Sequence, residues 1–165
     1  MRSTFGQAPA AAPYPATSVT EAAAPATRDI PYDYVARFAL SGRRGNRVQD
    51  VLNISVEGSF VAATVGYSFI PGPGRTGSTE RTIDFKYSIV DSATGRELQN
   101  RPIHNIAGLG DARGERPFRA LAKPMTFSPR STIRFEIEEI SEGLQYEGAE
   151  LYIVLHGYKI LGSEL

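Results

Sequence analysis

The sequence contains no cysteine and no tryptophan, and its charges cancel. Without cysteine the chain has no disulfide, no thiol nucleophile and no thiolate ligand for zinc. Its 18 Lys and Arg residues equal its 18 Asp and Glu residues, so no overall field attracts nucleic acid or an acidic membrane. No apolar run approaches the roughly twenty residues of a membrane span, and the N-terminus lacks the apolar stretch of a secretory signal. We therefore expect a soluble protein with no membrane partner and no direct contact with nucleic acid.

The first 29 residues differ in composition from the rest of the chain. They are mainly Ala, Pro, Ser and Thr, and prolines at positions 9, 13, 15 and 25 remove backbone donors and block helix formation. We expect an extended N-terminal arm over residues 1–29 and a single domain over residues 30–165. Because such an arm has no core of its own, its scattered apolar side chains are the predicted anchors on a partner surface: Phe5, Tyr14 and Val19.

Beyond the arm, apolar residues recur at every second position, which is the period of a β-strand. In the clearest run Ile133, Phe135 and Ile137 alternate with charged residues, and no window of ten residues shows a helical apolar stripe. The pattern predicts an all-β fold with little helix. We expect an antiparallel β-sandwich, jelly-roll-like, of seven or eight strands.

Several segments of the chain predict how the strands are connected and where they lie in the sheets. Turn residues between positions 141 and 148 favour an antiparallel hairpin that joins the strand near residues 133–138 to the one near 151–155, and the two apolar faces of the latter predict a central strand. Residues 99–116 follow neither period, which predicts an irregular crossing between sheets. Pro124 predicts that residues 118–127 form an edge strand or contain a bulge.

The strand predicted over residues 59–70 alternates between larger and smaller side chains. The larger set is expected to point inward: Val61, Ala63, Val65, Tyr67 and Phe69. The smaller set would suit a close neighbour or an interface: Ala62, Thr64, Gly66 and Ser68.

Two groups of residues resemble ligand sites in composition only. The glycines from Gly72 to Gly77 match a dinucleotide-binding fingerprint, but that motif needs a helix after it and here a strand is predicted. His104 and His156, together with Asp111 or Asp33, offer ligands for zinc or iron, yet no two of them have motif-like spacing. A hydrogen-bonded core or interface histidine is the commoner outcome. We expect no cofactor and no metal.

Glu136 and Glu138 form a possible carboxylate pair. Strand geometry places them on one face about 7 Å apart, a separation that glycosidases use. Alternating charges on the solvent side of a half-buried strand explain them as well, and Arg134 is available to neutralise them. No nucleophile elbow accompanies the serines. We therefore expect no enzymatic activity.

Two loops concentrate arginines. The first carries Arg43, Arg44 and Arg47, and the second carries Arg113 and Arg116, with Arg119 close behind. Aromatic side chains are not interleaved with these arginines, which favours docking onto an acidic protein surface over binding a nucleic-acid backbone.

The Ala/Pro-rich arm, the all-β body and several short stretches resemble small structural proteins of tailed bacteriophage particles. The stretches are Arg116-Pro117-Phe118-Arg119, residues 129–134 (Pro-Arg-Ser-Thr-Ile-Arg), and residues 155–161 (Leu-His-Gly-Tyr-Lys-Ile-Leu). The resemblance implies a non-catalytic virion protein of the capsid decoration, cement or connector type, assembled in the host cytoplasm. It implies capsid, portal or tail subunits as partners, contact through the arm, and a homo-oligomer.

Two other functions stay open from the sequence. One is a β-sandwich module that binds carbohydrate or protein, although stacking on sugars favours the indole ring that this chain lacks. The other is a jelly-roll metalloenzyme built on the two histidines.

Overall fold

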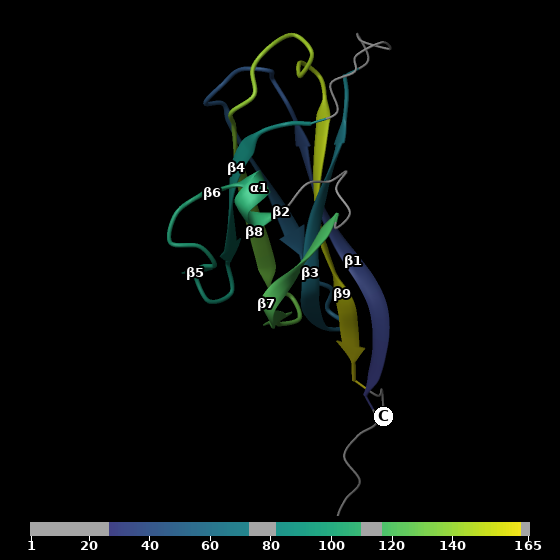
Figure 1. The fold of residues 1–165 in the computed structure, drawn as a ribbon. Coiled ribbons are helices and arrows are strands. Elements are labelled where there is room, and N and C mark those ends of the chain that lie inside the picture. The colour runs from purple at the N-terminus through teal and green to yellow at the C-terminus, as the bar shows by residue number, and fades with distance from the viewer. Residues whose placement is uncertain (1–26, 73–81, 110–116, 163–165) are drawn as a thin grey trace, which may run out of the picture.

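The structure is a computed structural model that describes residues 27–72, 82–109 and 117–162. Seven strands of seven or more residues, two strands of two residues and one helical turn make up this part of the chain (Figure 1). In chain order they are β1 (Arg28–Ala39), β2 (Arg47–Asn53), β3 (Gly58–Ile70), β4 (Phe85–Asp91), β5 (Arg96–Glu97), β6 (Ile103–His104), α1 (Asn105–Gly108), β7 (Phe118–Phe127), β8 (Thr132–Glu139) and β9 (Glu150–Leu161). The predicted all-β fold with little helix is confirmed.

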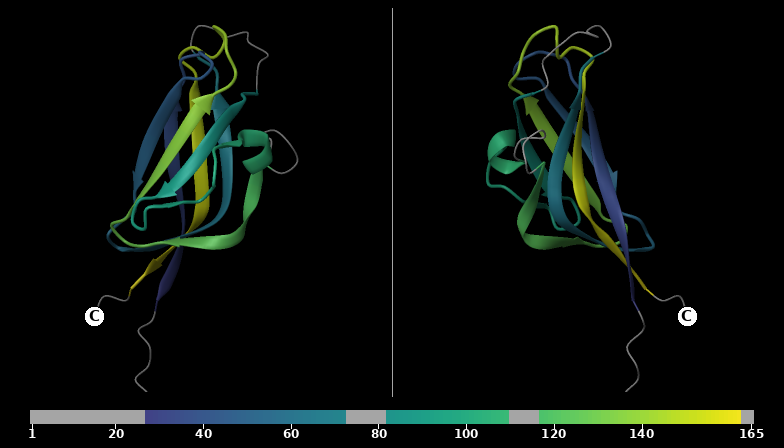
Figure 2. Two further views of the ribbon diagram at one scale, coloured as in Figure 1. Left: turned by 90° about the vertical axis from the view of Figure 1, so that its left-hand side faces the viewer. Right: turned by 45° about the vertical axis from the view of Figure 1, so that its right-hand side comes forward.

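The strands form two antiparallel sheets packed face to face (Figure 2). One sheet has the order β1-β9-β3-β7 and the other β2-β8-β4-β5, with β6 also paired to β4. The pairs are nested: β1 with β9, β2 with β8, β3 with β7, and β4 with β5. A long antiparallel ribbon rolled up on itself gives this order, which is the arrangement of a jelly roll.

The expected hairpin between β8 and β9 is wrong. β8 pairs with β2 and β4 in one sheet, whereas β9 pairs with β1 and β3 in the other. Residues 140–149 therefore cross between the sheets, which in sandwiches lie about 10 Å apart. A loop of this length and glycine content can form a hairpin within one sheet or connect two sheets.

The position of each strand in its sheet agrees better with the sequence. β9 lies between β1 and β3, as its two apolar faces predicted. β7 lies at a sheet edge, and its pairing jumps from Met125 opposite Ala62 to Ala120 opposite Thr64, so the segment containing Pro124 bulges out. Both expectations from Pro124 are confirmed.

The inward set expected for β3 is only half right. Phe60 and Ala62 point into the core at the start of the strand, and Val65 and Tyr67 do so after a register shift between Ala62 and Thr64. Even-numbered residues face inward before the shift and odd-numbered residues face inward after it. The extra residue causes this change, because successive side chains in a strand alternate between the two faces.

The core lies between the sheets and is rich in aromatic rings. Phe38, Phe60, Phe85 and Phe135 are almost fully buried, each stabilising the fold by roughly 1.5–3 kcal/mol relative to an exposed side chain. Tyr67 of one sheet meets Phe85 of the other edge to face, with ring centres 5.3 Å apart. This packing presents the opposite face of each sheet outward.

Strand β1 begins at Arg28, two residues before the expected start of the domain at residue 30. Its first half runs beside the end of β9 (Figure 1), and the start of β3 pairs with the other side of β9. Residues 1–26 lie outside the described part of the chain, so the division into an arm over residues 1–29 and a domain over 30–165 stays a prediction.

Candidate interaction surface

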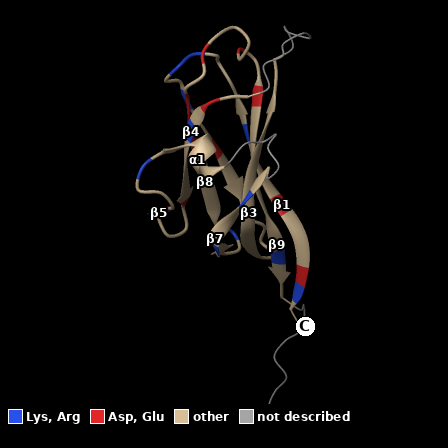
Figure 3. Ribbon diagram, in the orientation of Figure 1, with Lys and Arg blue, Asp and Glu red and all other residues tan. Residues whose placement is uncertain are grey.

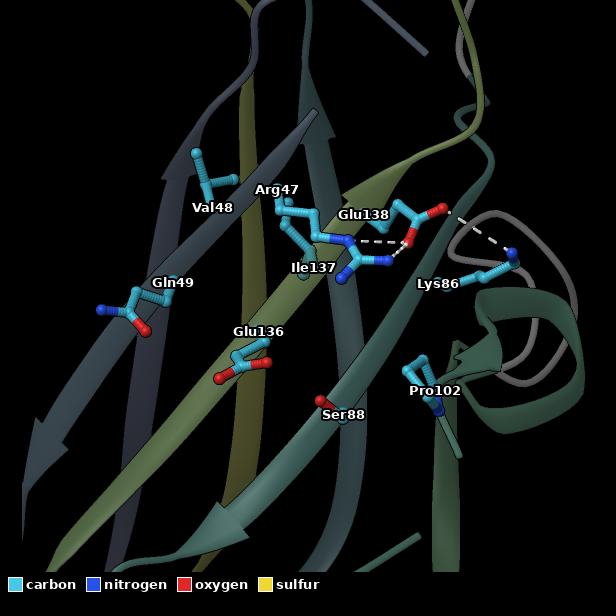
Figure 4. A pocket seen from close by; sticks show the side chains of 9 residues that line it. All are labelled: Arg47, Val48, Gln49, Lys86, Ser88, Pro102, Glu136, Ile137 and Glu138. Atoms are coloured by element: carbon cyan, nitrogen blue, oxygen red, sulfur yellow. Dashed lines mark hydrogen bonds and ion pairs between the residues drawn. The ribbon is translucent and has the colours of Figure 1, made fainter. Parts of the chain in front are cut away.

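The two outer faces of the sandwich differ in chemistry. On the β2-β8-β4 side, residues directly opposite one another form a row of alternating charge: Arg47 of β2, Glu138 of β8 and Lys86 of β4. Glu138 lies 2.8 Å from the Arg47 guanidinium and 3.7 Å from the Lys86 ammonium (Figure 4). The row ties three strands together and gives this face a polar surface.

A shallow groove of about 260 Å³ lies along that row. Gln49 and Ser88 flank Glu136 in the next row, and Pro102 closes one side (Figure 4). Glu136 and Glu138 lie on one face of β8, as their spacing predicted, and both line this groove. Each already has a cationic partner, since Arg134 lies 3.0 Å from Glu136.

The outer face of the β1-β9-β3-β7 sheet has both apolar and polar rows, and Asp33, His156 and Thr64 form one of the polar rows. One row crosses all four strands and consists of Val35, Val154, Gly66 and Phe118. Val35 is 45% exposed, Phe118 is 51% exposed, and Ile70 at the upper end of β3 is 52% exposed. Tyr152 and Tyr158 of β9 lie half-buried on the same face. We call these six residues the apolar face: Val35, Ile70, Phe118, Tyr152, Val154 and Tyr158.

Phe118 lies at the β7 end of this row, and its ring reaches over position 66, which has no side chain. A Cβ on Gly66 would lie 2.5 Å from Cδ1 of the Phe118 ring, so the ring occupies the space that any larger residue would fill. The ring also meets the imidazole of His156 edge to face, with centres 4.3 Å apart. The glycine in β3 therefore allows an aromatic side chain to lie over that strand.

His156 has a structural explanation on this face. Its Nδ1 lies 3.0 Å from Oδ1 of Asp33 on the neighbouring strand, and its Nε2 is buried beside Phe118. His104 is in β6 at the edge of the other sheet, 3.8 Å from Asp84. The structure does not bring the two histidines together, and over residues 27–72, 82–109 and 117–162 no three His, Asp or Glu side chains are placed to hold a metal ion.

A charged cluster borders the apolar face at its upper end. Arg37 of β1 pairs with Glu150 of β9, and the Tyr152 hydroxyl donates to the same carboxylate. These hydrogen bonds, led by the one from Arg37, lower the pKa of Glu150. The hydrogen bond to Glu150 raises the pKa of Tyr152, so its hydroxyl stays neutral. The cluster forms a polar rim beside apolar side chains.

The first arginine loop is held by a buried carboxylate. Glu139 is 1% exposed and accepts hydrogen bonds from the backbone N–H of Ser41 and of Gly42, both at 2.9 Å. It also accepts from the Ser41 hydroxyl at 3.1 Å and the Asn46 amide at 2.8 Å. Four donors around one carboxylate fix the conformation of the loop.

The arginines of this loop have different environments. Arg43 and Arg44 are exposed in the loop between β1 and β2, and Figure 3 shows basic residues in the loops at the end opposite the marked C-terminus. Neither has an ion pair among the residues that the structure describes. Arg47 instead takes part in the row with Glu138. Arg47 therefore has a structural partner, whereas Arg43 and Arg44 are exposed cations.

The remaining predicted partner contacts lie outside the described residues: Phe5, Tyr14, Val19, Arg113 and Arg116. The same holds for Asp111 and for most of the glycine fingerprint. The apolar face itself was not predicted as a site. Its signals were the second apolar side of residues 150–161 and the small residues of β3, of which Thr64, Gly66 and Ser68 do point outward.

The described helix is too short and too polar to cross a membrane. No family model matches the chain, and no curated protein matches it. Among solved structures it is similar to a protein from Sulfurospirillum deleyianum, with a TM-score of 0.34 and 14% identity over 81% of this chain and 98% of that one. It is also similar to VP2 of the infectious bursal disease virus subviral particle, with a TM-score of 0.33 and 13% identity over 81% of this chain and 33% of that one.

The structure of the Gx strain of the same virus gives a TM-score of 0.26 and 13% identity over 81% of this chain and 34% of that one. This chain therefore spans about a third of the length of the two viral chains. TM-scores this low support no conclusion about function.

Proposed function

We propose that the protein is a non-catalytic structural protein of an assembled particle, which binds neighbouring subunits through the apolar face. The observation that carries this proposal is the apolar row Val35, Val154, Gly66 and Phe118, which spans a whole sheet on its outer side. Exposed apolar side chains that include an aromatic ring and have polar groups beside them are typical of protein interfaces. The opposite outer face, with its rows of paired charges, has the character of a solvated surface.

The particle that best suits this protein is a virion of a tailed bacteriophage, in which it would act as a capsid decoration or cement protein or another minor virion protein. The jelly roll is a common building block of capsids, although lectins and cupins share it, so the fold alone assigns no function. The bacteriophage assignment rests on the resemblance of the arm and body to such proteins. Its partners would be further copies of this chain and capsid, portal or tail subunits.

The N-terminal arm would add to the same contact. β1 starts at Arg28 on the edge of the sheet that carries the apolar face, so this sheet is the first part of the described domain to follow the arm. The free edge of β7 offers a second route, by strand addition. β7 is regular over Phe118 to Ala120 and over Met125 to Phe127, and the bulge between these segments interrupts the strand. We therefore favour contact through the apolar face over strand addition.

A pair of matched valines tests the proposal. Val35 on β1 and Val51 on β2 are 45% and 44% exposed, but Val35 lies on the apolar face and Val51 on the charged one. We expect Val35→Asp to weaken self-association of the full chain by about 30-fold or more, since an unpaired charge would be buried in the contact. Val51→Asp should leave it unchanged. Light scattering across a concentration series measures both.

If the two variants associate equally, the apolar face is not the contact. A wild-type chain that stays monomeric at every concentration would refute self-association, and incorporation of the same variants into assembled particles would then test heterologous subunits. Deletion of residues 1–26 leaves all described strands intact and separates the contribution of the arm from that of the face.

The groove on the charged face favours a second candidate, a module that binds carbohydrate or protein. Gln49, Ser88 and Glu136 present amide, hydroxyl and carboxylate groups along a depression of about 260 Å³. No aromatic ring lines it among the described residues, so sugar binding would rest on hydrogen bonds alone. A glycan array with the wild type and Gln49→Ala would show specific signals that the variant loses.

A further inference from the structure

A second cavity, of about 170 Å³, opens between the two sheets on the side where β7 and β5 form their edges. It exists because β7 bulges away from β3 between Ala120 and Met125 and because Ala62 beneath it is small. Tyr87 and Ile89 of β4 form the opposite wall. The cavity is separate from both outer faces of the sandwich.

The walls of this cavity are apolar and its rim is cationic. Ala62, Val65, Leu121, Phe127 and Leu155 line the interior. Arg119 lies opposite Val65 in the pairing of β7 with β3, on the side of β7 that faces the cavity, and it is exposed at the rim. Its guanidinium donates to the carbonyl of Ala107. One rim cation above an apolar interior is suited to a ligand with an apolar body and one anionic end.

Tyr87 adds a neutral hydroxyl to the same wall. Burial raises the pKa of Tyr87 to about 12, with the nearby Arg119 charge acting in the opposite direction. Gly108 of α1 leaves room for this hydroxyl, because a Cβ there would collide with it. The lining therefore carries two uncharged polar side chains, Tyr87 and Gln99, and one permanent cation, Arg119.

We propose that this cavity binds a short-chain carboxylate, with its apolar chain between the sheets and its carboxylate on Arg119. The volume limits the apolar part to about six carbons, since an apolar cavity of about 150 Å³ holds one benzene molecule. Arg119 supplies the recognition of the carboxylate, because a guanidinium presents paired N–H donors to two oxygens. The inference does not depend on the apolar face.

Hexanoate and 1-hexanol, titrated separately into the full chain and followed by amide chemical shifts, test the proposal. About five buried methylenes predict a dissociation constant of about 1 mM for hexanoate, with shifts at residues around Leu121 and Ile89. We expect Arg119→Gln to weaken hexanoate about fivefold and to leave 1-hexanol unchanged, because only the carboxylate uses the cation.

A filling variant and its matched control locate the binding. Leu121→Trp places extra atoms at the cavity and should abolish binding of both compounds. Leu144→Trp makes the same change in an exposed loop far along the chain and should bind both as the wild type does. Unperturbed shifts up to about 20 mM hexanoate, about twenty times the expected dissociation constant, would overturn the proposal. So would equal loss in both tryptophan variants, or equal hexanoate affinity with and without Arg119.

Discussion

Replacement of Glu139 by glutamine is expected to destabilise the protein more than its conservative chemistry suggests. The Glu139 carboxylate is buried, one oxygen accepts from Ser41 and Asn46, and the other accepts from the Gly42 N–H. Glutamine keeps only one acceptor oxygen. If that oxygen keeps the donors of Ser41 and Asn46, the new NH₂ group faces the Gly42 N–H, and two donors meet.

The cost combines a lost charge-assisted hydrogen bond with a buried N–H that has no acceptor. Each of these two effects destabilises the protein by about 1–3 kcal/mol. Glutamine also removes a buried charge, which offsets part of this cost, so we expect a loss of about 2–4 kcal/mol in the free energy of unfolding. Urea unfolding followed by circular dichroism measures it through the midpoint and slope.

Glu138→Gln is the matched control for this experiment. Glu138 is the preceding residue on β8, faces outward and pairs with Arg47 and Lys86 near solvent. Ion pairs of this kind contribute about 0–1 kcal/mol, so this variant should remain close to the wild type. A Glu139→Gln protein within about 0.5 kcal/mol of the control would refute the role assigned to the buried carboxylate.

Three further outcomes follow from the geometry. The folded-state pKa of Tyr87 is about 12 against an ordinary value of 10.0, so its stabilising contribution is full below pH 10 and is lost as the pH rises toward 12. Between pH 10 and pH 12 the free energy of unfolding of the wild type should fall by about 1–3 kcal/mol relative to that of Tyr87→Phe. If the free energies of unfolding of the two proteins change equally with pH, the assignment is contradicted. Arg37→Gln should raise the pKa of Glu150 toward its usual range, because the strongest hydrogen bond that lowers it is removed; an unchanged carboxyl titration by NMR would oppose this. Gly66→Ala should displace the Phe118 ring and cost about 1–3 kcal/mol in unfolding free energy, and a variant as stable as wild type would show that the ring does not need that space.

Alternation along the chain was sufficient to identify the long strands and, in β8, the face that is buried. Ile133, Phe135 and Ile137 are buried as the two-residue period requires, because a strand with one apolar side has only one way to face a core. Pro124 marked an edge and a bulge because its missing N–H cannot take part in a continuous ladder. These properties are local and need no knowledge of the partner strand.

Topology and the interaction surface required the folded chain. The period of β8 and β9 is compatible with a hairpin or with strands in two sheets, and only the packing of the whole sandwich separates them. The side chains of β3 that face the core depend on a single extra residue in the strand, and the sequence pattern does not reveal this residue. The apolar face combines Val35, Val154 and Phe118 from three strands far apart in sequence, over a glycine from a fourth. Residues so distant in the chain become one surface only through the register of strand pairing, which is a property of the tertiary structure.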